Sequence, residues 1–440
     1  MTSKKFQNSK QTKNIFEIVF LLFVTLFTSC GHQGKVISLT DDGTWCWFSD
    51  PRAILSGNGK LLTGYVTGDG SVAALSFDLN SGEKSISILN EKLEVDDHNN
   101  PAFLQRADGH LLAFYTKHHN NDLYMNVSQK PGEASAWDGA VAINPNRASD
   151  AERFGDNKYT YANPFKLKDE NDRIYLFGRW IGFKPNITWS DDGGQTWSNG
   201  RVVVSPMPFS QRQRPYVKYF SDGKSKIHMV FTDGHPRDEP TNSVYYAYYF
   251  NGAFHRAGGE VICTLEDLPF EPREATLVYD AKQTGALAWV FDIYADENGQ
   301  PAIAYARYPT ENEHIYHYAW FNGEDWNDKM IVNSGKWFPQ TPDGQLEREP
   351  HYSGGLTISP DSEHSLFISR EVNNIFEIEK WELDVKNDKW KTTPVTQNSQ
   401  TDQIRPYAVK NTDKTLLLWN SVERYVHYTD YKTGIKLYYE

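Results

Sequence analysis

Pro101-Ala-Phe-Leu-Gln-Arg-Ala-Asp108-Gly109-His-Leu-Leu112 is the stretch that decides the fold. It combines a proline-led apolar strand, an Asp-Gly turn and a second apolar strand, which is the signature of a β-hairpin. Six related stretches begin at Pro51, Pro164, Pro215 and Pro406, or keep only the turn at Asn298-Gly299 and Pro360-Asp361. Self-similarity at roughly 50 to 75 residues, built from strands, predicts a radial or stacked array.

Each repeat can be divided into four strands. In the third repeat these are residues 164–168, 174–178, 186–190 and 201–204. Phe, Trp and Tyr make up 14% of the chain, which is typical of strands, and no long helical period follows residue 40. Seven such units predict an all-β fold, a seven-bladed β-propeller of four-stranded antiparallel blades. A β-solenoid, the main alternative, has far shorter repeats.

Two local features refine this prediction. Ser190-Asp-Asp192-Gly-Gly194-Gln-Thr196-Trp197 matches the Asp-box turn, whose Asp binds backbone N–H groups and whose Trp packs between sheets. We expect this role to be structural. The chain ends at Tyr438-Tyr439-Glu440, after what we interpret as the third and fourth strands of blade seven. An extra strand near residues 35–39 is expected to close the ring.

The N-terminus has the parts of a secretory signal peptide, with four lysines before an apolar run over residues 18–27. The small residue before Cys30 indicates lipoprotein-type cleavage, although Phe27 stands where Leu or Val is usual. We therefore expect residues 1–30 to be a signal peptide, Cys30 to be lipidated, and residues 31–440 to form one catalytic propeller domain. The protein is then exported and held at the outer membrane by a lipid anchor, as a monomer.

Net charge and cysteines limit the partners. A net charge of −12 argues against nucleic acid. An anionic ligand therefore needs a local basic patch. Only Cys46 and Cys263 follow Cys30, and a large β core does not need a disulfide, so we expect both to be unpaired.

Propeller geometry assigns the loops to two faces. The Asp-Gly turns mark one face, and the opposite face carries the entry to each inner strand and the connection after the second strand. Three positions before the leading proline, blades two to four place His98, Tyr161 and Arg212. The second-strand connections and the blade-four entry add His118, His119, Arg179, Arg214 and His235. Singly, each of these residues is more commonly structural, but their grouping predicts a site at one mouth of the channel.

This residue set suits β-elimination on a uronic acid. A cation next to the carboxylate stabilises the enolate-like transition state, and a Tyr or His can remove the proton and protonate the leaving oxygen. A cation nearby would also lower a tyrosine pKa. No metal or other cofactor is required for this chemistry.

Several motifs resemble the sialidase-repeat-like (BNR) propeller family that contains the ulvan lyases of polysaccharide lyase families 24 and 25. The matching stretches are Trp45-Cys-Trp-Phe-Ser-Asp50-Pro-Arg, Asp97-His98-Asn-Asn-Pro101, Tyr115-Thr-Lys-His118, Tyr161-Ala-Asn-Pro164, Phe231-Thr-Asp-Gly-His235-Pro-Arg and Tyr352-Ser-Gly-Gly. The resemblance covers residues 44–438. It implies a lyase for a sulfated rhamnose-uronate polysaccharide.

By the same resemblance, His98 and Tyr161 form the catalytic pair, His118 is a second active-site histidine and Arg179 neutralises the carboxylate. Tyr161 as both base and acid, helped by His98, is the preferred assignment. The expected substrate-binding residues are Arg212, Arg214, His235, His119, Asn100 and Trp47. Some relatives hold a structural metal, for which Cys263, His235, His314 and His317 are conceivable ligands.

Two other functions fit the same fold. One is a glycoside hydrolase of the sialidase-like type, although the Phe-Arg-Ile-Pro motif is absent near Asp50-Pro51-Arg52 and the cluster has no central carboxylate pair. The other is a non-catalytic carbohydrate-binding propeller, since fold alone does not determine function.

Overall fold

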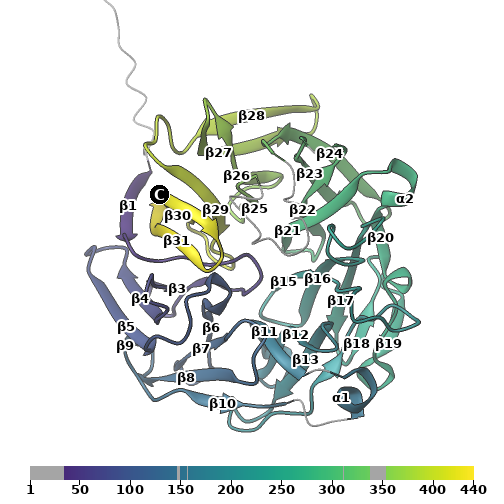
Figure 1. Cartoon of the computed structure of the whole chain (residues 1–440), viewed down its shortest axis with the longest axis horizontal. Helices are drawn as coiled ribbons and strands as arrows, with labels where there is room; N and C mark the ends of the chain where they lie inside the picture. Colours follow the sequence, from purple (N-terminus) through teal and green to yellow (C-terminus); the bar gives the residue numbers. More distant parts are fainter. Residues whose placement is uncertain (1–33, 146–148, 156, 311, 337–352) are drawn as a thin grey trace, which may run out of the picture. The chain divides into compact units, whose positions relative to one another are not determined.

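A computed structural model describes residues 34–145, 149–155, 157–310, 312–336 and 353–440. Within the unit Gly34–Glu440, seven antiparallel sheets form a ring with their inner strands nearest the centre (Figure 1). This confirms the predicted all-β, seven-bladed propeller. The expected signal peptide and Cys30 lie outside the described residues. Over the described ranges, no helix has the length and apolar character needed to cross a bilayer.

The first four blades follow each other along the chain. Blade one contains β2 (Ala53–Leu55), β3 (Lys60–Val66), β4 (Val72–Asp78) and β5 (Lys84–Asn90). Blade two contains β6 (Ala102–Gln105), β7 (Leu111–Thr116), β8 (Leu123–Lys130), β9 (Glu133–Trp137) and β10 (Val141–Ile143). Blade three contains β11 (Asn157–Leu167), β12 (Arg173–Ile181), β13 (Pro185–Ser190) and β14 (Arg201–Val202). Blade four contains β15 (Val217–Ser221), β16 (Lys226–Thr232), β17 (Val244–Phe250), β18 (Ala253–His255), β19 (Val261–Thr264) and β20 (Thr276–Tyr279).

The remaining strands complete the ring. Blade five contains β21 (Leu287–Ala295), β22 (Pro301–Tyr308), β23 (Ile315–Phe321) and β24 (Trp326–Asn333). Blade six contains β25 (Leu356–Ile358), β26 (Ser365–Val372), β27 (Ile375–Asp384) and β28 (Lys389–Pro394). Blade seven contains β29 (Asp402–Ala408), β30 (Leu416–His427), β31 (Asp430–Tyr439) and β1 (Lys35–Thr40). The described helices are short: α1 (Ser149–Phe154), α2 (Ala281–Thr284), η1 (Asp97–Asn99), η2 (Lys168–Glu170), η3 (Leu265–Asp267) and η4 (Pro272–Glu274).

Two blades extend the four-stranded pattern. The second sheet has five strands because β9 pairs with β8, and the fourth has six because β18, β19 and β20 add to β17. The additions follow the third strand, away from the inner strands β6 and β15. They leave the arrangement around the centre unchanged.

Blade seven is closed by the N-terminal strand. β1 pairs antiparallel with β31, with Ile37 opposite Leu437, so the expected closing strand is confirmed. The assignment of a third and fourth strand to the C-terminus was wrong, because β30 and β31 are the second and third strands of this sheet. Pairing with β1 covers the edge of β31, which would otherwise expose unpaired backbone groups.

The Asp box adopts the predicted turn. Asp192 Oδ1 accepts hydrogen bonds from the backbone N–H groups of Gln195 and Thr196 at 2.9 and 2.8 Å. The Trp197 ring packs edge-on against Phe114 of blade two, with centroids 5.8 Å apart. The turn therefore joins blade three to blade two. Cys46 and Cys263 are unpaired, as expected.

Leu39 tests the closing strand. It is 1% exposed and packs in the core cluster shared by blades seven and one, whereas Val36 on the same strand is 45% exposed. Leu39→Ala should lower the free energy of unfolding by about 2–5 kcal/mol because it leaves a cavity in that core. Val36→Ala is the matched control and should change it by less than about 0.5 kcal/mol. Equal denaturant midpoints for the two variants would contradict the role assigned to β1.

Candidate active site

A cavity of about 190 Å³ lies where the inner strands begin, on the face opposite the Asp-Gly turns. Seven of the residues expected from the sequence line it: Trp47, His98, His118, Tyr161, Arg179, Arg214 and His235. They come from blades one to four. The geometry therefore brings together all four expected catalytic side chains.

Three expected residues lie elsewhere. Arg212 is exposed and lines a neighbouring hollow with Phe183, and Arg214 is common to this hollow and the cavity. The His119 ring stacks on Phe183, with centroids 4.5 Å apart. Asn100 is fully buried, and its Oδ1 accepts the Cys46 N–H at 3.2 Å. Asn100 therefore supports the cavity wall rather than facing into the cavity.

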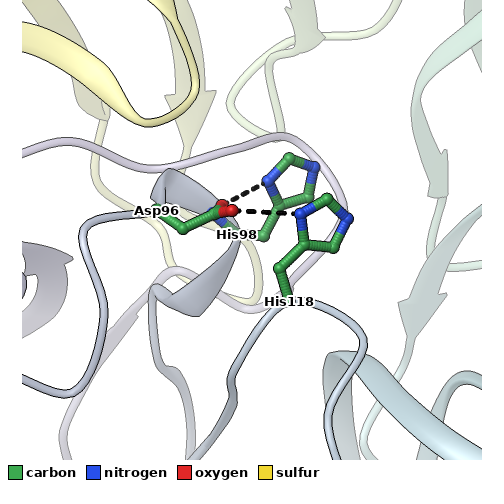
Figure 2. Close-up of side chains that lie close together, drawn as sticks. All are labelled: Asp96, His98 and His118. Atoms are coloured by element: carbon green, nitrogen blue, oxygen red, sulfur yellow. Dashed lines mark hydrogen bonds and ion pairs between the residues drawn. The ribbon is translucent and has the colours of Figure 1, made fainter.

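His98 and His118 form a stacked pair. Their ring centroids are 4.0 Å apart and the planes differ by 11°. His98 lies in η1, which Asp96 caps by accepting the His98 N–H, and His118 follows β7. Asp96 lies behind both rings, with His98 Nδ1 2.7 Å from Oδ1 and His118 Nδ1 3.0 Å from Oδ2 (Figure 2).

The two histidines differ in charge. Burial disfavours the charged form of His98, but the charge of Asp96 and hydrogen bonds to Asp96 and Asp97 raise its pKa well above the ordinary value. Burial and the charge of His98 lower the pKa of His118 to about 4, against the hydrogen bond to Asp96. At neutral pH the pair therefore holds one charged and one neutral imidazole.

A β-bulge aims Tyr161 into the cavity. The register of β11 against β12 shifts between Thr160 and Asn163, and Tyr161 adopts a left-handed backbone with φ of 67°. Gly178 opposite permits this approach, because a Cβ there would lie 2.6 Å from the Tyr161 carbonyl oxygen. The sequence pattern places Tyr161 on the right face but does not reveal the bulge.

Arg179 joins two tyrosines. Its guanidinium carbon lies 4.9 Å from the ring centre of Tyr161 and 5.1 Å from that of Tyr216, and Nη1 donates to the Tyr216 hydroxyl at 2.6 Å. Burial and the neighbouring Tyr216 raise the pKa of Tyr161 well above its ordinary value. Burial acts in the same direction on Tyr216, but the charges of Arg179 and Arg214 lower its pKa. Tyr161 is thus a protonated phenol, and Tyr216 is the more acidic of the two.

The floor of the cavity is the buried segment 45–50, which has no regular structure. Side chains of five blades bind its backbone: Arg52 of blade one, Asn100 of blade two, Asn163 of blade three, Lys218 of blade four and Arg405 of blade seven. Buried backbone groups need such partners. The segment also places Phe48 5.4 Å from the Tyr161 ring and 5.0 Å from the Tyr216 ring, between centroids.

Charged groups hold this floor in place. Asp50 accepts bonds from Arg52 Nε at 2.9 Å and from Lys218, and all three side chains are at most 7% exposed. Burial raises the pKa of Asp50, but the charges of Lys218 and Arg52 outweigh it and hold the pKa below its ordinary value. A paired, hydrogen-bonded cluster is the form in which charges are tolerated inside a protein.

Several side chains that line the cavity were not predicted from the sequence. Tyr216, Trp289, Tyr425 and Tyr428 line the cavity, and Asp97 forms part of its wall. Asp97 Oδ2 accepts bonds from Arg405 Nη1 at 2.5 Å and from the Tyr425 hydroxyl at 2.6 Å. The sequence does carry a signal for the residues that bind the floor segment. Asn100 and Asn163 both directly precede a leading proline, and both bind the floor segment.

The conceivable metal ligands Cys263, His235, His314 and His317 do not gather at one point in the described part of the chain. The group of metal-ligand residue types found there is Asp96, His98 and His118, with one donor atom from each lying within 4.8 Å of the others. Asp96 contacts each Nδ1 directly at hydrogen-bond distance. The three residues therefore form a hydrogen-bonded group in this structure.

Residues 61–334, more than half of the chain, match the model of the BNR repeat-containing family. The chain belongs to this family. No curated protein sequence matches this BNR family member.

Solved structures of similar fold include polysaccharide lyases. A PL25 ulvan lyase has a TM-score of 0.66 and 15% identity, covering 92% of this chain and 96% of its own. A PL25 ulvan lyase bound to -[GlcA(1-4)Rha3S]- has a TM-score of 0.65 over the same shares. The polysaccharide lyase Uly1 has a TM-score of 0.60 and 11% identity, covering 92% of this chain and 97% of its own. At these identities the likeness of the BNR family member to the lyases lies in the fold.

Asn163 tests the floor of the cavity. Its Oδ1 accepts the Asp50 N–H at 2.9 Å and its Nδ2 donates to the Phe48 carbonyl at 3.1 Å. Asn163→Ala leaves both buried backbone groups unpaired and should lower the free energy of unfolding by about 2–4 kcal/mol. Asn199→Ala, at an exposed site, is the control. Denaturant curves that coincide for the two variants would show that the floor does not need this side chain.

Proposed function

We propose that this protein is a polysaccharide lyase that cleaves a sulfated rhamnose-uronate polysaccharide of the ulvan type by β-elimination, leaving unsaturated uronide ends. The observation that carries the proposal is the convergence of Arg179, Tyr161 and two unlike imidazoles on one cavity. β-Elimination needs a cation at the carboxylate, a base for the adjacent proton and an acid at the leaving oxygen. The fold shared with polysaccharide lyases supports the same conclusion.

Each side chain has a role that follows from its charge. Arg179 and the imidazolium of His98 pair with the uronate carboxylate, so negative charge that develops on its oxygens is stabilised. His118 is neutral, and its Nε2 accepts the proton from the carbon that bears the carboxylate. Tyr161 is protonated and donates to the glycosidic oxygen.

The bonds and protons balance over one turnover. The carbon–hydrogen bond next to the carboxylate and the bond to the glycosidic oxygen break, and a carbon–carbon double bond forms between the two carbons. His118 gains a proton and Tyr161 loses one, and exchange with solvent restores both. This assignment replaces Tyr161 as both base and acid, because burial makes its phenolate a poor resting state.

The charges around the cavity suit an anionic chain. Arg179, Arg214 and Arg237 line it beside the ion pair of Asp97 and Arg405, although the protein as a whole has a net charge of −12. Cations concentrated in a cleft attract an anionic ligand that the remaining surface repels. Arg212 extends this positive region into the neighbouring hollow.

Most glycoside hydrolases use two carboxylic groups that reach the glycosidic bond. Asp96 and Asp97 are the carboxylates next to the histidines, and they are only 3% and 1% exposed. Asp96 is engaged by both imidazoles, and Asp97 by Arg405 and Tyr425. Their placement supports the lyase, in which carboxylates act behind the imidazoles.

The activity is tested by incubating the mature protein with ulvan and with other uronic-acid polysaccharides. Rising ultraviolet absorbance from an unsaturated uronide supports the lyase. New reducing ends without that absorbance would identify a hydrolase, and retention of the polysaccharide without either would identify a binding protein.

Tyr161→Phe isolates the proposed acid. Loss of the hydroxyl removes proton donation to the leaving oxygen, so kcat should fall at least about a hundredfold with little change in KM. Tyr439→Phe is the matched control, since Tyr439 packs on Phe77 in the outer part of blades seven and one. An unchanged rate of uronide formation by Tyr161→Phe would rule out this assignment.

We also infer that residues 1–30 direct export and that Cys30 carries a lipid anchor. The full chain produced in a Gram-negative host should fractionate with membranes, and Cys30→Ser should release it while leaving the folded domain intact. Identical fractionation of the two forms would exclude an anchor at Cys30.

A further inference from the structure

Asp96 is the single carboxylate shared by the two active-site histidines. We propose that Asp96 is a positioning residue that gives the two histidines different protonation states. It holds His98 as the imidazolium and His118 as the neutral imidazole whose Nε2 faces the cavity. The inference rests on the proposed lyase activity for its role, but the protonation states that it assigns do not depend on any substrate.

The hydrogen bonds fix one proton on each ring. An ionised carboxylate only accepts hydrogen bonds, so the Nδ1 atoms 2.7 and 3.0 Å from Asp96 must both carry hydrogen. The two histidines can then differ only in whether Nε2 carries a proton. In Figure 2 the second nitrogen of each ring points away from Asp96, and both point toward the same side.

Stacking allows only one additional proton. Two positive rings with centroids 4.0 Å apart would repel each other, which disfavours the doubly charged pair. At most three protons are therefore shared among four ring nitrogens. In the three-proton state one histidine is a cation that donates from Nε2, and the other has a lone pair there.

The surroundings decide which histidine is charged. His98 Nδ1 is also 3.1 Å from Asp97 Oδ1, while Arg179 adds positive charge near His118. Asp97 is itself held by Arg405 and Tyr425. The other titratable groups around the pair are Cys46, Glu94, Tyr161 and Tyr428. Glu94 binds the backbone N–H of His118 rather than its ring. Only the His98 ring therefore has a second carboxylate, Asp97, beside it, and this favours the cation at His98.

Asp96 acts through the imidazoles. It is 3% exposed and lies behind both rings, so it does not reach a bound sugar. Carboxylates behind histidines orient the ring and set the tautomer, and their loss commonly costs about ten- to a hundredfold in activity. Tyr428 packs edge-on against both rings, with centroids 4.9 and 5.2 Å away, and limits their rotation.

The same three residues could be read as a metal site. A shared ion would need ligand atoms that converge on one point, whereas both Nδ1 atoms bond directly to Asp96 and both Nε2 atoms point away from it. The geometry therefore favours a proton-sharing triad, and a bound metal becomes an outcome of the test.

The first test reads the protonation states directly. Nitrogen-15 histidine spectra of the wild-type protein at neutral pH, assigned with His98→Gln and His118→Gln, should show His98 protonated on both nitrogens and His118 protonated on Nδ1 only. Two neutral rings, or an Nε2–H tautomer at His118, would overturn the proposal. So would added zinc that displaces the Nδ1 protons of both rings at equimolar concentration.

The second test removes the carboxylate. Asp96→Asn keeps the shape but lacks the charge, so burial should lower the pKa of His98 and leave it neutral at neutral pH. With Asp96 present, activity that needs charged His98 is lost only as pH rises through its raised pKa. In Asp96→Asn this loss should move to lower pH, and kcat/KM should fall about ten- to a hundredfold.

The control is Asp122→Asn. Asp122 is half-buried, lies in the loop after β7 that also carries His118, and accepts a hydrogen bond from the Tyr124 hydroxyl. It should leave the pH–rate profile and the His98 spectrum unchanged. A folded Asp96→Asn protein with the wild-type profile and a charged His98 would refute the role of Asp96. If the wild type has no lyase activity but shows the expected spectra, the proposed function fails while the assigned protonation states stand.

Discussion

The segment 45–50 is the constraint on which the site depends. It is buried irregular backbone inside a ring of sheets, and such a segment is stable only if its N–H and C=O groups find partners. Side chains of five blades supply them, including Asn100, Asn163 and Lys218. The floor is consequently tied to most of the ring, and its position fixes Phe48 against Tyr161.

Buried ion pairs also hold the residues around the cavity in place. Asp50 is balanced by Arg52 and Lys218 below the floor, and Asp97 is balanced by Arg405 beside it. Buried charges of this kind are tolerated because each is paired and hydrogen-bonded. The guanidinium of Arg179 also lines the cavity, and under the proposed function a sugar carboxylate is its negative partner.

The sequence allowed much of this to be predicted. The repeated proline-led hairpins predicted the number of blades. The rule that propeller geometry assigns the loops to two faces placed His98, Tyr161, His118 and Arg179 together, and all four line the cavity. The same rule chose Arg212, which lies in the neighbouring hollow, because the chain before β15 is irregular. Tyr216, directly after Pro215, fills the position instead.

Other features depend on contacts that no local pattern encodes. The strand order of blade seven was misassigned: β30 and β31 are its second and third strands, and the predicted closing strand β1 supplies the fourth. The bulge at Tyr161 arises from the register of β11 against β12. The bonds from Asp96 to both histidines require η1 and the end of β7 to meet, which spacing alone does not determine.

The central claim is that this cavity breaks a glycosidic bond by elimination and not by adding water. The most direct measurement is digestion of a uronic-acid polysaccharide in water labelled with heavy oxygen, followed by mass spectrometry of the new chain ends. Elimination predicts unlabelled fragments, with the new uronide end lighter by one water than a hydrolysis product. Heavy oxygen incorporated at the cleaved bond would contradict the account.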